Sequence, residues 1–170
     1  MKELILGGVR SGKSRLAEQH ALFTGLPVIY IATATADDEE MRARIAHHQA
    51  HRSTQWQLIE EPLALATALQ YAAKKNQCVL VDCLTLWLTN LLCLQDETRL
   101  QAEVTALLQV LPTLPGHIIL VSNETGMGVV PLGELTRRYC DEAGRLHQAI
   151  AVTCERVILT VAGLPLILKG

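Results

Sequence analysis

The sequence lacks a strong excess of charge of either sign. Its 170 residues include 15 Lys and Arg and 17 Asp and Glu, which gives a formal net charge of −2. Nucleic acids and anionic membranes attract proteins through clustered positive charge, so this balance offers no electrostatic case for either partner. The sequence also lacks an apolar run long enough to cross a bilayer, and we expect no membrane span.

Closely spaced cysteine pairs are missing too. The five cysteines are an odd number without a C-x-x-C motif, and they are Cys78, Cys83, Cys93, Cys140 and Cys154. This pattern indicates reduced, mostly buried thiols rather than a disulfide framework. The sequence enters its first predicted strand at residue 2 without a charged and then apolar leader. We therefore expect a cytoplasmic protein.

The sequence does contain enough apolar material for one core. Hydrophobic residues make up 49% of the chain, and its length suits a single domain spanning residues 1–170. We find no internal repeat and no low-complexity segment.

A glycine-rich segment near the start gives the first functional signal. Residues 2–6 are an apolar stretch, and residues 7–14 match G-x-x-x-x-G-K-[ST], the pattern of a phosphate-binding loop between a strand and a helix. Its glycines let backbone amides converge on an anion, its lysine approaches the β- and γ-phosphates, and its last hydroxyl binds Mg²⁺. We therefore predict nucleotide binding by Gly7, Gly8, Val9, Arg10, Ser11, Gly12, Lys13 and Ser14.

Apolar strands alternate with helical segments along the rest of the sequence. Strands are predicted at residues 2–6, 28–32, 55–60, 78–82, 117–124, 156–161 and 163–168. One helix is predicted to begin at Ser14, and others at residues 38–51, 63–74, 84–94, 97–111 and 134–154. This alternation predicts an α/β fold of the P-loop, RecA-like type, with a mostly parallel sheet and helices on both faces.

Polar residues follow several predicted strands at the point where each strand ends. Thr33–Thr35, Asp82 and Ser122–Glu124 all stand at such positions, as does the glycine-rich loop. Ligands of parallel α/β sheets bind at the carboxyl ends of the strands, so we expect one site there. Asp82 either holds Mg²⁺ together with Ser14 or caps the next helix, and the two roles are compatible.

Three histidines at residues 47, 48 and 51 fall within one predicted helix, and three interpretations of them are open. His47 and His51 share a helix face and could bind zinc, although a third ligand and the H-E-x-x-H glutamate are missing. They could form a solvated face beside basic residues, which the pattern alone favours. One of them could also attack phosphorus and carry a nucleotidyl group as a phosphoramidate.

These segments together resemble the bifunctional adenosylcobinamide kinase / adenosylcobinamide-phosphate guanylyltransferase family of cobalamin biosynthesis. The resemblance covers nearly the whole sequence, and the histidine segment and the Asn-Glu-x-Gly-x-Gly segment make it specific. The matching stretches are residues 7–14, 30–34, 44–48, 56 with 60–62, 81–85, 122–131, 138–139 and 141–144. The chain departs from the family pattern at Ser53, Thr125 and His147, the last of which stands where Asn is common.

The resemblance implies two reactions in one chain. The enzyme would phosphorylate the hydroxyl of adenosylcobinamide with ATP or GTP, and would then transfer GMP from GTP onto that phosphate, releasing pyrophosphate. His47 would carry the guanylyl group and Lys13 would act on the phosphates, with Mg²⁺ as cofactor. Guanine-nucleotide contacts would extend to Ala32, Thr33, Ala34, His48, Gln49, Ala50, His51, Glu60 and Asp82.

The resemblance further implies a homotrimer whose substrates are adenosylcobinamide, its phosphate and the nucleotides. Two other functions are compatible with the residues alone. One is a P-loop kinase of another small molecule, whose histidines are merely solvated, and the other is a regulatory nucleotide switch. Glu60 and Glu61 could also be no more than acids placed before a helix that Pro62 begins.

Overall fold

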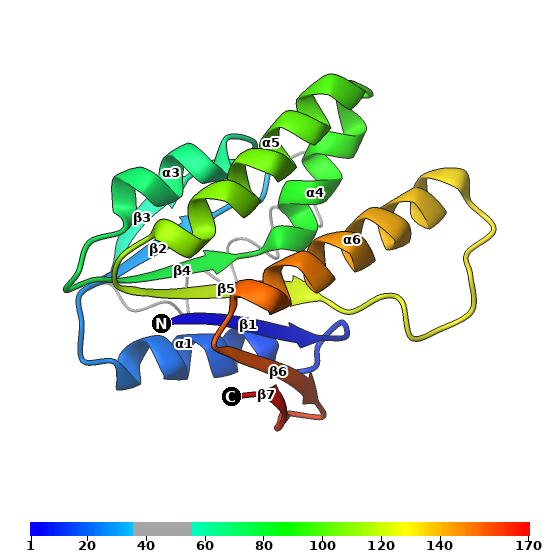
Figure 1. Ribbon diagram of the computed structural model, residues 1–170. Helices are drawn as coiled ribbons and strands as arrows, with labels where there is room; N and C mark the ends of the chain where they lie inside the picture. Colours follow the sequence, from blue (N-terminus) through cyan, green and yellow to red (C-terminus); the bar gives the residue numbers. More distant parts are fainter. Residues whose placement is uncertain (36–55) are drawn as a thin grey trace.

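A sheet of parallel strands forms the centre of the fold (Figure 1). The computed structural model describes residues 1–35 and 56–170. Within these ranges the strands are β1 (Lys2–Gly7), β2 (Val28–Ala32), β3 (Gln57–Glu60), β4 (Cys78–Asp82), β5 (His117–Asn123), β6 (Arg156–Val161) and β7 (Leu164–Lys169). They lie in the order β3-β2-β4-β5-β1-β6-β7, and every neighbouring pair is parallel except the antiparallel β6–β7 hairpin.

Helices cover both faces of this sheet. The described helices are α1 (Lys13–Phe23), α3 (Leu65–Ala72), α4 (Leu84–Cys93), α5 (Glu97–Val110), a short 3-10 helix (Leu111–Thr113) and α6 (Glu134–Thr153). In Figure 1, α1 lies below the sheet, whereas α3, α4, α5 and α6 lie above it. The strands between them need apolar side chains on both faces, which explains their continuous apolar runs.

The two layers of helices create two apolar clusters. The larger one joins the sheet to α3–α6 and includes Trp87, which is fully buried and donates from Nε1 to the Leu63 carbonyl oxygen at 2.7 Å. The smaller one packs Ala17 and Ala21 of α1 against the other face of the sheet. Each large apolar side chain buried in this way stabilises the fold by about 1.5–3 kcal/mol, so the central strands are held from both sides.

The predicted fold class is confirmed, and the differences are at the ends of elements. The helix expected at residues 63–74 begins only at Leu65, because the Glu61 carboxylate first accepts hydrogen bonds from the amides of Leu63 and Ala64 at 2.9 and 2.8 Å. The helix expected at residues 97–111 ends at Val110, and the 3-10 helix follows it directly. The helix expected at residues 38–51 lies outside the described residues.

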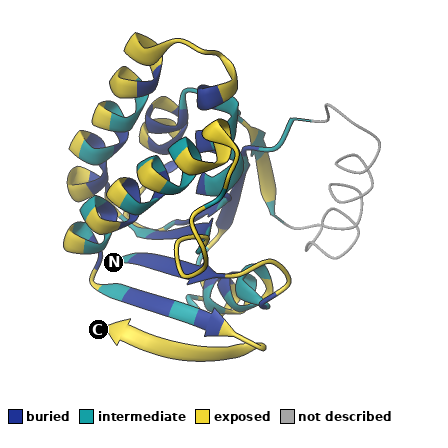
Figure 2. Cartoon of the chain, turned by 90° about the vertical axis from the view of Figure 1, so that its right-hand side faces the viewer, coloured by how far each residue is buried: buried dark blue, intermediate teal, exposed yellow. Residues whose placement is uncertain are grey.

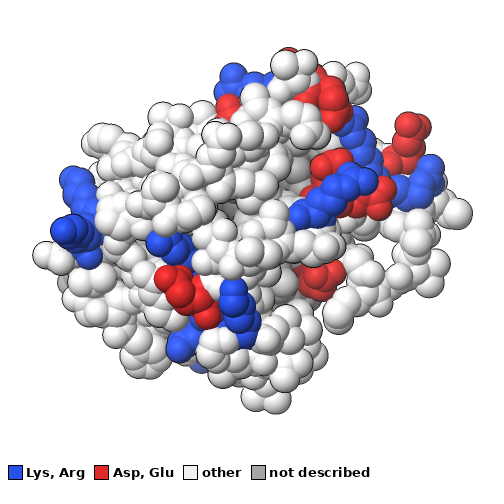
Figure 3. Space-filling view, in the orientation of Figure 1, with Lys and Arg blue, Asp and Glu red and all other residues white. Residues whose placement is uncertain are grey.

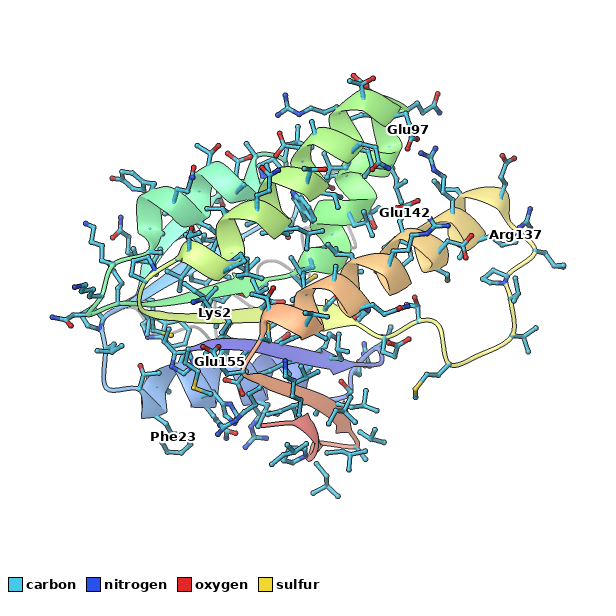
Figure 4. All side chains as sticks on the ribbon, viewed as in Figure 1. Lys2, Phe23, Glu97, Arg137, Glu142 and Glu155 are labelled. Carbon is cyan, nitrogen blue, oxygen red and sulfur yellow. The ribbon has the colours of Figure 1, made fainter. Side chains whose placement is uncertain are left out.

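The surface of the described residues has two exposed segments, β7 and the loop at residues 124–133, and a charged region over α5 and α6. β7 is exposed along its whole length, and the loop at residues 124–133 is exposed over most of its length (Figure 2). Charges of both signs lie side by side over the upper ends of α5 and α6 (Figure 3), where Arg138 pairs with Glu97 and Arg145 with Glu142. Figure 4 labels Glu97 and Glu142 in this region.

The cysteines agree with the prediction of reduced, mostly buried thiols. All five are free, Cys78, Cys83 and Cys154 are buried, and Cys93 is exposed. Burial raises the pKa of Cys83 to about 11 and that of Cys154 to about 12, so both thiols stay protonated at neutral pH. No helix in the described part of the chain is long and apolar enough to span a membrane.

Candidate active site

The phosphate loop lies between the end of β1 and the start of α1. Gly12 takes a positive φ of 93° there, and a Cβ on it would lie 3.1 Å from the Cα of Gly163. A Cβ on Gly7 would lie 2.7 Å from the carbonyl oxygen of Thr160 and would collide with the Ser11 side chain. Both positions therefore require glycine, because the loop folds tightly against the β6–β7 hairpin.

The amino end of α1 is open to an anion. Its first residue is Lys13, and no side chain caps it, so the amides of its first turn keep their hydrogen-bonding capacity. The hydroxyl of Ser11 is buried and has no hydrogen-bond partner among the described residues. Free amides, an unpartnered hydroxyl and the positive end of the helix dipole converge here, which is the arrangement that binds phosphate.

The Lys13 side chain folds back onto the phosphate loop. Its ammonium group donates to the carbonyl oxygen of Gly8 at 3.2 Å. Burial lowers the pKa of Lys13, whereas the nearby groups of Cys83 and Asp82 act to raise it, and the net direction is down. A partly buried ammonium interacts more strongly with a phosphate than an exposed one, because less water screens the pair.

Asp82 ends β4 in line with residues of the neighbouring strands. Ala32 of β2 is in register with Asp82 on one side and with Glu60 of β3 on the other. The Tyr30 hydroxyl donates to Oδ2 of Asp82 at 2.8 Å, an orienting contact that the sequence analysis missed. Tyr30 stands in an apolar strand, and the sequence gives no sign that its hydroxyl reaches the next strand.

The oxygen atoms at this edge suit Mg²⁺. A carboxylate on Asp82 and a hydroxyl on Ser14 are hard ligands, and Mg²⁺ in nucleotide sites typically takes one or two such ligands and completes its shell with phosphate and water. No group of three or more His, Cys, Asp or Glu side chains that could hold a metal is present in residues 1–35 and 56–170. The proposed zinc ligands His47 and His51 lie outside these residues, so this finding concerns the carboxyl edge of the sheet alone.

Thr33 supports this edge through its side chain. It is fully buried, and its hydroxyl donates to the Cys83 carbonyl oxygen at 2.6 Å and accepts from the Cys83 amide at 3.0 Å. Asn90 of α4 donates to the carbonyl oxygen of Thr33 at 2.8 Å. The hydroxyl, amide and carbonyl oxygen of Thr33 are thus all bonded within the protein, which fixes the backbone where β2 ends.

The end of β5 lies between the phosphate loop and Asp82. Asn123 is in register with Gly7, Val121 with Asp82, and the amide of Glu124 donates to the carbonyl oxygen of Gly7 at 3.0 Å. The polar residues expected at the carboxyl ends of the strands therefore come together at one edge. The predicted site residues His47, His48, Gln49, Ala50 and His51 lie outside the described residues.

These features define a P-loop nucleotide-binding protein with a RecA-like arrangement of strands. Among solved structures, a RadB recombinase is similar with a TM-score of 0.54 and 19% identity, covering 93% of this chain and 73% of that one. At this identity the likeness shows the fold alone.

Sequence comparison then places the protein within one family. The model of "Cobinamide kinase / cobinamide phosphate guanyltransferase" matches residues 3–168, and the chain belongs to this family. A bifunctional adenosylcobalamin biosynthesis protein, CobP of Pseudomonas aeruginosa, is 66% identical over 170 residues, covering 100% of this chain and 98% of that protein. A CobU protein of Escherichia coli is 36% identical and covers 99% of this chain and 100% of its own length.

Proposed function

We propose that this chain phosphorylates adenosylcobinamide with a nucleoside triphosphate and then transfers GMP from GTP to the resulting phosphate, giving adenosylcobinamide-GDP and pyrophosphate. One observation carries the proposal: an open phosphate loop occurs in a chain that is 66% identical, over its full length, to a bifunctional adenosylcobalamin biosynthesis protein. One domain would perform both reactions, since phosphate loop, acids and histidine segment belong to the same chain.

In the kinase step, the protein mainly positions the phosphates of the nucleotide and neutralises their negative charge. Residues 7–14 cradle the phosphates through backbone amides, and Lys13 balances charge that develops as the terminal phosphoryl group moves. Mg²⁺, held by Ser14 and Asp82, would supply further charge neutralisation at the phosphates. The hydrogen bond from Tyr30 keeps the Asp82 carboxylate in one orientation.

In the transfer step, the imidazole of His47 attacks the α-phosphorus of GTP. A bond forms between nitrogen and phosphorus, and the bond to the β-phosphate oxygen breaks, releasing pyrophosphate. The phosphate of the corrinoid then attacks the same phosphorus and frees the histidine. We assign guanine-nucleotide contacts to Ala32–Ala34, His48–His51, Glu60 and Asp82, which include the row Glu60–Ala32–Asp82 across three strands.

The assembly and location follow from the same proposal. We propose a homotrimer in the cytoplasm, with ATP or GTP as phosphoryl donor. The chain's free cysteines are compatible with a reducing compartment, and its balanced charge suits small-molecule substrates rather than nucleic acid.

Mass spectrometry of the intact protein after incubation with GTP tests the proposal. We expect one added GMP that is lost in acid and kept in base. His47→Ala should abolish the adduct, whereas His20→Ala, which changes a histidine on α1, should label like the unchanged protein. Labelling of the His47→Ala variant would show that another residue is the nucleophile.

A further inference from the structure

A chain of polar side chains at the end of β5 is not used by the functions assigned so far. Ser122 is 1% exposed, and its hydroxyl lies 2.8 Å from Nε2 of His147 on α6. The hydroxyl of Thr85 lies 3.4 Å from the same Ser122 oxygen and accepts the amide hydrogen of Asn123 at 2.7 Å. On its other side, Nδ1 of His147 faces Oε2 of Glu124 at 3.9 Å.

The hydrogen bonds are consistent with one form of His147, in which Nε2 accepts and Nδ1 carries the proton. Because the Asn123 amide must donate to Thr85, the Thr85 hydroxyl is free to donate to Ser122, and Ser122 can donate to Nε2 of His147. Nδ1 then carries the proton and points it at Glu124; the opposite tautomer would set a lone pair against the carboxylate. Burial lowers the pKa of His147, although Glu124 acts to raise it, and the net direction favours the neutral ring.

Glu124 is fixed beside the phosphate loop. Its amide donates to Gly7, the first residue of the loop, and its Oε1 accepts from the Gly126 amide at 2.6 Å. The Tyr139 hydroxyl of α6 is buried near the same polar group, with Thr85 and Glu124 around it, and burial raises its pKa to about 12. A carboxylate whose own backbone is bonded to the phosphate loop is a candidate to take a proton from an incoming alcohol.

We propose that Glu124 is the general base of the kinase step and that His147, oriented by Ser122, is the positioning residue whose Nδ1 faces the Glu124 carboxylate. This inference rests on the proposed function, because it concerns the transfer of phosphate to the corrinoid hydroxyl. The hydroxyl proton passes to Oε2 of Glu124 while the hydroxyl oxygen bonds to the terminal phosphorus. The bond from that phosphorus to the bridging oxygen breaks, and the nucleoside diphosphate leaves with the electron pair.

Glu124→Gln tests the role of the carboxylate. We expect kcat for corrinoid phosphorylation to fall by at least about 100-fold, as for loss of a general base. The KM for the nucleoside triphosphate and the covalent labelling by GTP should stay within about threefold, because Glu124 has no part in the histidine chemistry. Glu103→Gln, whose carboxylate pairs with Arg99 on α5, is the matched control and should match the unchanged protein.

Two amide replacements of His147 separate positioning of Glu124 from support of Ser122. Asn places its amide where Nδ1 stands and keeps an N–H directed toward Glu124, whereas Gln places its amide near Nε2 and reaches Ser122 instead. His147→Leu should lower kcat about tenfold with little change in KM. His147→Asn should recover most of this loss, and His147→Gln should recover little of it.

Three results would overturn the proposal. If Glu124→Gln keeps kinase turnover within about threefold of the unchanged protein, Glu124 is not the general base. If His147→Gln rather than His147→Asn recovers activity, His147 acts as a structural support of Ser122. Equal loss of phosphorylation and GMP labelling in Glu124→Gln would indicate a general defect of the site. An unchanged protein that fails to phosphorylate cobinamide would instead contradict the proposed function, and the role of Glu124 would fall with it.

Discussion

The two ends of the same parallel sheet treat polar groups differently. At the carboxyl end, no side chain caps the amides of α1, and the buried hydroxyl of Ser11 has no hydrogen-bond partner among the described residues. At the amino end, Glu3 of β1 is fully buried between His20, whose Nδ1 lies 2.8 Å from Oε1, and His117, whose Nε2 lies 3.6 Å from Oε2. The first end keeps hydrogen-bonding capacity for a ligand, whereas the second sets a buried carboxylate against side chains of the protein itself, so we expect it to govern stability.

The strongest way to break the site at the carboxyl end is to remove its cation. Lys13→Ala should lower both corrinoid phosphorylation and GMP transfer about 10³-fold, because charge that develops on the phosphates loses its closest protein counter-charge. Product formation from labelled ATP and GTP measures the effect. Lys75→Ala, which changes an exposed lysine, should match the unchanged protein. Residual activity above about a tenth in Lys13→Ala would exclude this role.

The second-largest loss of activity is expected when Asp82 can no longer bind Mg²⁺ as a carboxylate. Asp82→Asn should lower turnover about 100-fold and raise the Mg²⁺ concentration needed for half-maximal activity, because a charged ligand becomes a neutral one. Tyr30→Phe removes only the orienting hydrogen bond and should cost a few-fold at most. Titration of activity with Mg²⁺ measures both variants. An unchanged Mg²⁺ requirement in Asp82→Asn would leave Asp82 as a helix cap alone.

The amino end should respond through stability rather than catalysis. Glu3→Gln should lower the free energy of unfolding by about 3 kcal/mol, since the buried side chain at residue 3 loses the carboxylate that contacts His20 and His117. Urea unfolding measures this loss, and nucleotide affinity should remain unchanged. Reduced nucleotide affinity with unchanged stability would reverse the contrast between the two ends.

The stability difference between the unchanged protein and Glu3→Gln should depend on pH. Burial acts to raise the pKa of Glu3, but His117, His20 and Arg156 outweigh it, and the net pKa lies below the ordinary value of 4.5. The carboxylate therefore contributes stability above pH 4.5, and this contribution is lost as the pH falls through the folded-state pKa. Unfolding of the unchanged protein and Glu3→Gln should converge at acid pH. A difference that grows on acidification would contradict this assignment.

The smallest expected effect concerns the shape of the loop. Gly12→Ala places a Cβ on a residue with a φ of 93°, which should cost about 1–2 kcal/mol of stability. Gly8→Ala is the matched control, because a Cβ there meets nothing within 4 Å. Thermal unfolding of the two variants should separate them. Equal stability would show that the loop relaxes freely around residue 12.

The sequence predicts most of the fold, because its apolar strands and phosphate-loop motif have strong local patterns. It also predicts that Asp82 and Ser122–Glu124 gather at one edge, since parallel strands end together. It does not predict the contacts of Tyr30 with Asp82, of His147 with Ser122, or of His20 with Glu3. These join residues 52, 25 and 17 positions apart, and only the packing of separate elements brings them together.

The central claim is that the carboxyl edge of this sheet binds a nucleoside triphosphate for two successive transfers to a corrinoid. Mass spectrometry of the corrinoid after incubation with the unchanged protein tests it most directly. With cobinamide and ATP the account predicts cobinamide phosphate, and after addition of GTP it predicts cobinamide-GDP, with both formed about 10³-fold more slowly by Lys13→Ala. Unmodified cobinamide in both incubations, or equal products from Lys13→Ala, would contradict it.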